Sequence, residues 1–313
     1  MTSNNFDNNN IDYMNSRPLD VHTWSDYSEV NDFVDDIYLL LKSIKGHKKG
    51  NKRLLKVLLL DLYVAWTADP DLKILFSRDN NAYKAKSRYN ELHISKKIRD
   101  IVDVMVAEGI VYEKQGFNDR VSGIGFQSRL WATDGLIEQF KAAKFSQFQI
   151  HSHEAREPVV LRDEVKKDIE DYKDTPFVIS ARSLLADYNQ LLAKTHIDIY
   201  DLERPVLEIG EGKKKMRLQI NQQDKFVRRI FNNSRWDQGG RFYGGWWQRC
   251  PKDYRKKIKM DGIMTAEIDF SGLHIVMLYS QQGINYWAEL NEDPYQLHGI
   301  NDIDPDINLR AAL

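Results

Sequence analysis

The chain has 313 residues, of which 45 are basic and 46 acidic, so its formal charge is −1. The length predicts two domains, and the balanced charge means that any basic surface is local rather than general. A single cysteine, Cys250, excludes a disulfide framework and a cysteine-based zinc site.

No membrane-spanning segment or signal peptide is recognisable. The longest apolar stretch, residues 57–66, contains Asp61 and is too short to span a bilayer, and the N-terminus has no apolar signal core. We therefore predict a soluble, cytoplasmic protein without a membrane partner.

The N-terminal part combines a tail with a helical segment. Residues 1–20 are rich in asparagine and poor in large apolar side chains, which predicts a disordered tail. Residues 21–145 carry apolar side chains at helical spacing. Helices are predicted there at 30–41, 52–66, 81–89 and 95–108.

A β-hairpin is predicted after the last of these helices. Gly109 ends the helix, residues 110–113 form the first strand, and residues 124–133 return as the second after a turn-rich tip. Helices followed by a hairpin are the element order of a winged helix-turn-helix. The segment resembles the winged-helix domains of plasmid and phage replication proteins, which implies DNA binding by residues 21–145.

Five basic residues of this segment are candidate DNA contacts. Lys96, Lys97 and Arg99 lie in the first turn of the predicted recognition helix, the part that meets bases and phosphates in helix-turn-helix proteins. Arg120 and Arg129 lie on the predicted wing. The alternative is that these residues form a solvated helix face without a partner.

Residues 146–234 are predicted to be a connecting α/β region. Helices are expected at 164–172 and 180–193, and strands at 206–209 and 216–220. Two imidazoles, His151 and His153, have no third ligand at a matching spacing, so a polar linker is favoured over a metal site there.

From residue 235 onward the composition changes and two motifs appear. The first is Asp237-Gln238-Gly239-Gly240-Arg241, followed by an aromatic residue and a tyrosine. The second is Ile268-Asp269-Phe270-Ser271, at the end of a strand predicted over residues 264–270 and before a helix predicted over 273–281. An aspartate at such a strand end points into an open crevice in many sheet-based enzymes, although it also caps a following helix in many proteins.

The first motif resembles the Asp-x-x-Gly-Arg motif of single-subunit phage-type RNA polymerases. The second resembles motif A of the family A DNA polymerases. The resemblance implies that residues 235–313 are part of a polymerase palm. The predicted fold class is therefore α+β, with an N-terminal winged helix-turn-helix and a partial polymerase-type palm.

The resemblance also implies site residues and a cofactor. Asp269, with the carbonyl of Phe270, would hold Mg²⁺ in a two-metal site. Arg241 would contact the nucleic acid near this site, and Asp237 would orient Arg241. The implied partners are a DNA template with its primer and nucleoside triphosphates.

Two further residues are implied to contact the nucleotide. His274 stands where family A has a glutamate that helps to exclude ribonucleotides, and Arg310 stands where motif B begins. The lysine of motif B and the aspartate of motif C do not follow. We therefore expect an N-terminal fragment, inactive alone, that a downstream sequence or a C-terminal polymerase fragment in trans completes.

Between the motifs lies a basic stretch that includes Arg255, Lys256 and Lys257, for which nucleic-acid contact is favoured. Trp246 and Trp247 either stack on bases or pack inside the domain. The predicted function is template-directed polymerisation, most plausibly as a DNA polymerase of a phage or mobile element. The alternative is a non-enzymatic DNA-binding replication initiator or regulator.

Overall fold

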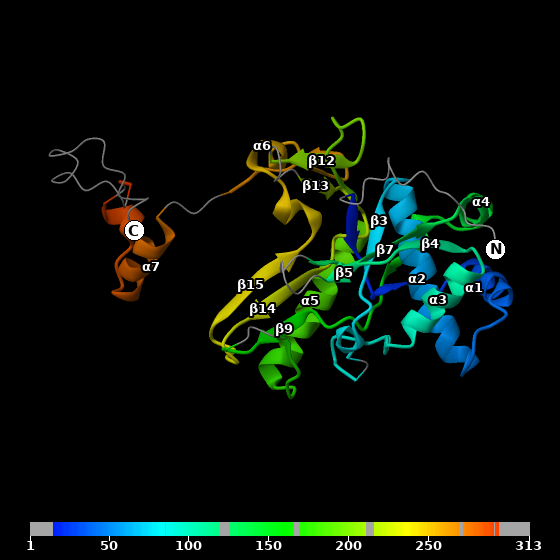
Figure 1. Cartoon of the computed structure of the whole chain (residues 1–313). Helices are drawn as coiled ribbons and strands as arrows, with labels where there is room; N and C mark the ends of the chain where they lie inside the picture. The colour runs from blue at the N-terminus through cyan, green and yellow to red at the C-terminus, as the bar shows by residue number, and fades with distance from the viewer. Residues whose placement is uncertain are drawn as a thin grey trace. The chain divides into compact units, whose positions relative to one another are not determined.

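The computed structural model describes residues 15–84, 86–118, 125–165, 169–210, 216–268, 272–290 and 292–293. These residues form both helices and strands, which confirms the mixed α and β class (Figure 1). The chain divides into two compact units, Met1–Met264 and Thr265–Leu313. Within the first unit we distinguish an N-terminal lobe, residues 15–153, and a second lobe, residues 156–264.

The N-terminal lobe is built around one buried helix. Its helices are α1 (Ser28–Leu40), α2 (Lys48–Ala68), α3 (Ile98–Ala107) and α4 (Asp134–Ala142). Helix α2 contacts α1, α3 and several strands of the lobe. Residues 54–65 of α2 are all buried, as expected for a helix that is apolar on nearly every side. The predicted helices at 30–41, 52–66 and 95–108 are confirmed with small shifts of their ends.

A four-stranded sheet packs against these helices, in the order β1-β3-β7-β4. The strands are β1 (Ser16–Pro18), β3 (Lys73–Phe76), β4 (Val111–Lys114) and β7 (Ser128–Ala132). β1 is parallel to β3, whereas β7 is antiparallel to both of its neighbours. The pairing of Ser16 with Lys73 corrects the predicted tail, because residues 15–20 are part of the folded lobe.

The predicted helix at 81–89 is wrong. Only a short 3₁₀ turn, η2 (Asn80–Ala82), forms among the described residues of that segment. The side chain of Asn90 accepts a hydrogen bond from Ile94 N and donates to the carbonyl of Lys84. Such side-chain bonds give the backbone an alternative to helix.

The second lobe contains a sheet with a helix on one face. Its elements are β9 (Val159–Arg162), β10 (Ile169–Glu170), α5 (Pro176–Lys194), β14 (Val227–Phe231) and β15 (Gly239–Gly244). The strand order is β10-β9-β14-β15, and α5 packs on β9 and β14. The predicted helix at 164–172 is wrong, because the described residues 169–170 pair with β9 instead. The predicted boundary at residue 234 lies between two paired strands, β14 and β15.

Small elements complete the first unit. They are β2 (Thr23–Trp24), β5 (Phe117–Asn118), β6 (Gly125–Phe126), η3 (Gln147–Gln149), β8 (His151–Ser152), β11 (Ile197–Asp198), β12 (Val206–Ile209), β13 (Met216–Gln219), η5 (Trp246–Arg249), α6 (Lys252–Arg255), β16 (Lys259–Met260) and β17 (Ile263–Met264). The hairpin β12–β13 confirms the two predicted strands. Trp246 is fully buried in the core beside β13, so its role is packing.

A glycine pair shapes the start of β15. The register with β14 shifts between Ile230 and Phe231, and Gly239 and Gly240 both have positive φ, at 80° and 74°. A Cβ atom at Gly240 would lie 2.8 Å from the ring of Phe231. Only glycine fits this β-bulge, which accounts physically for the glycine before Arg241.

An ion-pair network joins the two lobes. Nη1 of Arg88, in the N-terminal lobe, lies 2.9 Å from Oδ1 of Asp174 and 3.5 Å from Oε2 of Glu157. Arg182 on α5 binds the same two carboxylates, at 2.7 and 3.0 Å. The guanidinium carbon of Arg88 lies 3.8 Å from the centre of the Tyr172 ring. The network fixes the loop before α3 against the second lobe.

The second unit contains α7 (Leu273–Gln281) and α8 (Tyr286–Glu289) among its described residues. Helix α7 confirms the helix predicted over 273–281. Of the strand predicted over 264–270, only Met264 lies in a strand, at the end of β17, and residues 265–268 have no regular structure.

A buried ion pair ties β1 to α2. Asp61, in the middle of α2, is 1 % exposed, and its carboxylate accepts hydrogen bonds from both terminal nitrogens of Arg17, at 2.7 and 3.1 Å. It also accepts from the backbone N–H of Asp20 and from the hydroxyl of Thr23. Burial alone would lower the pKa of Arg17, but the Asp61 carboxylate more than offsets this and raises it. The pair explains why an aspartate interrupts the apolar stretch.

We expect Arg17→Met to lower the free energy of unfolding by about 3–5 kcal/mol, because it leaves the Asp61 carboxylate buried and uncompensated. The double variant Arg17→Met/Asp61→Leu removes both charges and is expected to be more stable than the single variant. Urea unfolding followed by circular dichroism measures both. Lys141→Met, which breaks the exposed pair with Glu138, is the control and is expected to change stability by less than about 1 kcal/mol. Additive losses in the double variant would contradict the role of the pair.

Candidate functional site

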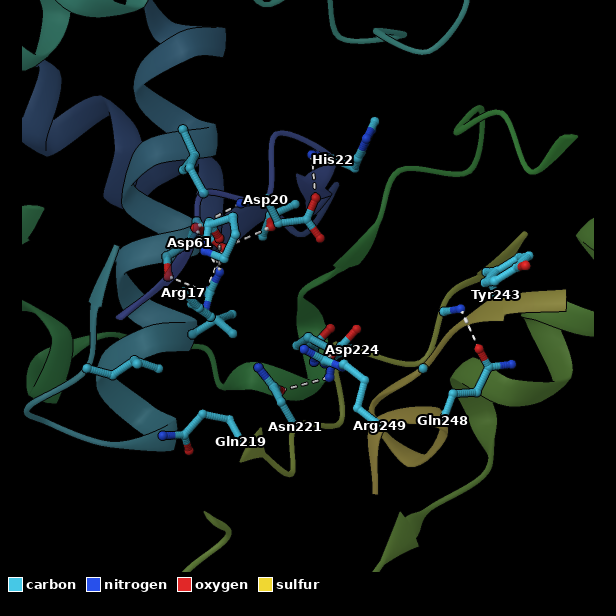
Figure 2. A pocket seen from close by; sticks show the side chains of 18 of the residues that line it. Arg17, Asp20, His22, Asp61, Gln219, Asn221, Asp224, Tyr243, Gln248 and Arg249 are labelled. Atoms are coloured by element: carbon cyan, nitrogen blue, oxygen red, sulfur yellow. Dashed lines mark hydrogen bonds and ion pairs between the residues drawn. The ribbon is translucent and has the colours of Figure 1, made fainter. Parts of the chain in front are cut away.

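A cleft of about 1360 Å³ lies within the first compact unit. One wall comes from β1, the loop after it and α2, and the other comes from β13, β14, β15 and η5 (Figure 2). Cavities that hold small molecules measure about 300–1,000 Å³. The cleft is therefore large enough for a chain-like ligand.

The lining of the cleft includes many charged side chains. The described residues contribute seven arginines and four carboxylates: Arg17, Arg156, Arg217, Arg228, Arg241, Arg249 and Arg255, with Asp20, Asp61, Glu208 and Asp224. The cleft thus carries an excess of three positive charges in a chain whose formal charge is −1. This basic surface is local, as the balanced charge of the chain requires of any basic surface.

Every carboxylate of the cleft is already engaged by an arginine. The ion pairs are Arg17–Asp61 at 2.7 Å, Arg156–Asp20 at 3.6 Å, Arg217–Glu208 at 3.5 Å and Arg249–Asp224. Burial would raise the pKa of Asp20, but the guanidinium of Arg156 outweighs it and lowers the pKa. Four of the seven guanidiniums are therefore neutralised within the protein.

Arg228 on β14 and Arg241 on β15 differ from these four. Neither guanidinium forms a hydrogen bond or an ion pair with any residue that the structure describes, although both backbones pair within the sheet. Burial and the nearby guanidiniums of Arg156 and Arg162 lower the pKa of Arg228. The carboxylates of Asp20 and Asp224 oppose this shift without cancelling it, so an anionic ligand would stabilise this half-buried cation further.

The two strands present these arginines on one face. Arg228 pairs directly with Tyr243, and Arg241 precedes Tyr243 by two residues on the same strand. The opposite face holds Arg229 and packs toward α5. The guanidinium of Arg229 lies over the rings of Phe231 and Phe242, and its Nε donates to the carbonyl of Gly240 at 2.8 Å.

The predicted Asp-x-x-Gly-Arg motif is only partly in this cleft. Arg241 lines it. Asp237 is exposed, and its carboxylate accepts two hydrogen bonds from Arg235, at 2.8 and 2.6 Å. This pairing lowers the pKa of Asp237. Asp237 is thus held by Arg235, which differs from the expectation that it orients Arg241.

Of the three candidate residues in the basic stretch after η5, one lines the cleft and two lie outside it. Arg255 lines the cleft. Lys256 pairs with Asp253 at 3.6 Å, and Lys257 pairs with Asp201 at 3.8 Å, both at exposed positions.

The candidate DNA contacts of the N-terminal lobe have different surroundings. Lys96 is exposed, whereas Lys97 pairs with Asp100 at 2.8 Å. Arg99 donates from Nη1 to the carbonyl of Arg78 at 3.0 Å. Arg129 is 8 % exposed and donates to the carbonyl of Gln127.

Several predicted site residues lie outside the described part of the chain. These are Arg120, Asp269, Phe270 and Arg310. His274 is described, and it is exposed in the first turn of α7. Among the described residues, no group of three or more His, Cys, Asp or Glu side chains is arranged to hold a metal ion. The predicted Mg²⁺ site at Asp269 therefore stays a prediction.

Sequence reasoning missed Arg228 and the role of the N-terminal residues in the cleft. Arg228 and Arg229 are neighbours in one strand and carry the same charge. Which of them faces the cleft depends on the side on which α5 packs, and α5 is remote in the sequence. Arg17 and Asp20 also line the cleft. They were missed because the asparagine-rich composition of residues 1–20 predicted a disordered tail.

No helix of the described residues is both long and apolar enough to cross a membrane. Comparison with family models, curated proteins and solved structures finds no match for this chain.

Proposed function

We propose that the chain binds nucleic acid in the cleft and that its arginines contact phosphate groups. The observation that carries this proposal is the position of Arg228 and Arg241. Both lie on one sheet face inside the cleft, without a partner among the described residues, while every carboxylate there is already paired. Arginine binds phosphate with two parallel hydrogen bonds, so a phosphate group is a suitable anionic ligand for these two arginines.

The size of the cleft supports a polymeric ligand. A mononucleotide or another small ligand needs only part of about 1360 Å³. A nucleic-acid backbone instead presents phosphates at regular intervals along the whole cleft. Because the net charge of the chain is −1, this attraction is local and directs the ligand to the cleft.

The N-terminal lobe supports a second contact, with duplex DNA. In its sheet β7, the returning strand of the hairpin, lies between β3 and β4, and α3 precedes the hairpin. This arrangement favours the winged-helix assignment, with α3 as recognition helix. Lys96 and Lys97 at its start would then meet DNA phosphates.

Replacing both unpaired arginines, in Arg228→Gln/Arg241→Gln, is expected to weaken binding of a fluorescent oligonucleotide by about tenfold or more per arginine. The slope of log affinity against log salt is expected to become shallower by about one per lost phosphate contact. Fluorescence anisotropy measures both quantities. The matched control is Lys141→Gln/Lys194→Gln, which removes two positive charges outside the cleft. Equal affinity of the arginine variant and the control would refute binding in the cleft.

Duplex binding by the N-terminal lobe is tested with Lys96→Ala/Lys97→Ala in the full chain. Affinity for duplex DNA is expected to fall, and each lost contact is expected to flatten the salt dependence by about 0.9. Arg99 is left intact, because its guanidinium holds the carbonyl of Arg78. A duplex mobility shift that matches wild type at every salt concentration would argue for the solvated-face alternative.

We also propose an enzymatic role for the chain, template-directed nucleotidyl transfer. Its support is that Arg241, from the polymerase-like motif, lies in the cleft that we assign to nucleic acid. Asp269 would hold Mg²⁺, and a C-terminal polymerase fragment in trans would supply the remaining groups. The non-enzymatic alternative, a replication initiator, needs the cleft but not Asp269.

Asp269→Asn separates these two possibilities. If Asp269 is a metal ligand, Mn²⁺ binding is expected to weaken in this variant, because the amide supplies no negative charge to the ion. Electron paramagnetic resonance of Mn²⁺, titrated with and without dATP, measures the change. Glu267→Gln, two residues away, is the control. Unchanged Mn²⁺ binding together with unchanged DNA affinity would favour the replication initiator.

A further inference from the structure

The face of β14 and β15 that lines the cleft carries an aromatic ring between its two unpaired arginines. Tyr243 is 43 % exposed and lines the cleft. We infer that the ligand of the cleft is a single-stranded nucleic acid, one base of which stacks on Tyr243. The inference rests on the proposed function and adds the strandedness of the ligand to it.

The register of β14 and β15 places both arginines next to Tyr243. Arg228 is directly across from Tyr243, a pairing in which Cβ atoms lie about 4.5–5.5 Å apart. Arg241 is two residues away on the same strand, at about 7 Å. A base stacked on the ring therefore has its own phosphate and the neighbouring phosphate close to the two guanidiniums.

The backbone around Tyr243 is fixed before any ligand arrives. The side chain of Gln248 accepts a hydrogen bond from Gly244 N at 3.0 Å (Figure 2). It also donates to the carbonyl of Phe242 at 3.2 Å. These bonds join Gln248 to the residues on both sides of Tyr243. A platform that is already ordered loses little conformational entropy on binding.

Neighbouring aromatic residues do not compete for this role. The ring of Phe242 points to the other face, where it packs against Tyr188 with a centroid distance of 6.2 Å. Trp246 is fully buried. Phe242 also borders the cleft, but Tyr243 is the ring of β15 that lies on the same sheet face as the two arginines.

The stacking contact is what selects a single strand. In a duplex the bases stack on one another inside the helix, so a ring on the wall of a cleft meets mainly sugar and phosphate. In a single strand the bases can be splayed apart and stacked on aromatic side chains, and such stacking does not depend on base identity. The inferred site therefore prefers single strands with little sequence specificity.

The test compares three fluorescent oligonucleotides of twelve residues: oligo-dT, an abasic strand with the same phosphates, and a duplex. Tyr243→Ala is expected to lower the affinity for oligo-dT by about 5- to 100-fold. Tyr243→Phe, which keeps the ring, is expected to retain it. The abasic strand is expected to bind wild type about as weakly as oligo-dT binds Tyr243→Ala. The abasic strand is expected to bind Tyr243→Ala no more weakly than it binds wild type.

Tyr27→Ala is the matched control, because Tyr27 is also 43 % exposed but lies outside the cleft. Thermal unfolding of each variant shows that the fold is retained. Equal binding of oligo-dT by wild type and Tyr243→Ala, or of oligo-dT and the abasic strand by wild type, would overturn the stacking inference. In that case, weaker oligonucleotide binding by Arg228→Gln/Arg241→Gln would still support the proposal that the cleft binds phosphates. Unchanged binding by that variant would refute the proposed function as well.

Discussion

A carboxylate in the middle of a buried helix sets the conditions for the rest of the first unit. Asp61 is 1 % exposed in α2, and an unpaired charge in that position would oppose folding. Arg17, the backbone of Asp20 and the hydroxyl of Thr23 all bond to it. These hydrogen bonds to the Asp61 carboxylate hold the segment that contains β1 against α2. That segment forms one wall of the cleft.

The opposite wall is positioned by further ion pairs. Arg88 and Arg182 share the carboxylates of Glu157 and Asp174, which ties the second lobe to the loop before α3. Burial lowers the pKa of Arg88, but Asp174 outweighs this effect. These ion pairs occupy acidic groups, and the carboxylates of the cleft are paired as well. Arg228 on β14 and Arg241 on β15 therefore keep their positive charge without an acidic partner among the described residues.

The motif around Arg241 has both a structural and a functional explanation. Gly239 and Gly240 adopt positive φ at a β-bulge, where a larger side chain would collide with Asn232 or Phe231. A bulge re-aims the side chains that follow it. The glycines are thus required by the strand geometry, and the proposed binding role belongs to Arg241 and Tyr243, which the bulged strand directs into the cleft.

The long helices α1, α2 and α5 and the hairpin β12–β13 could be predicted from the sequence, because their apolar spacing is a local pattern. The sequence also led to Arg241, through a motif. It failed at residues 169–170, where pairing with β9 overrides a helical pattern, and at residues 15–20, where a distant carboxylate orders a segment of polar composition. That Arg228 rather than Arg229 faces the cleft could not be predicted, because it depends on where α5 packs against the sheet and on which carboxylates the other arginines bind.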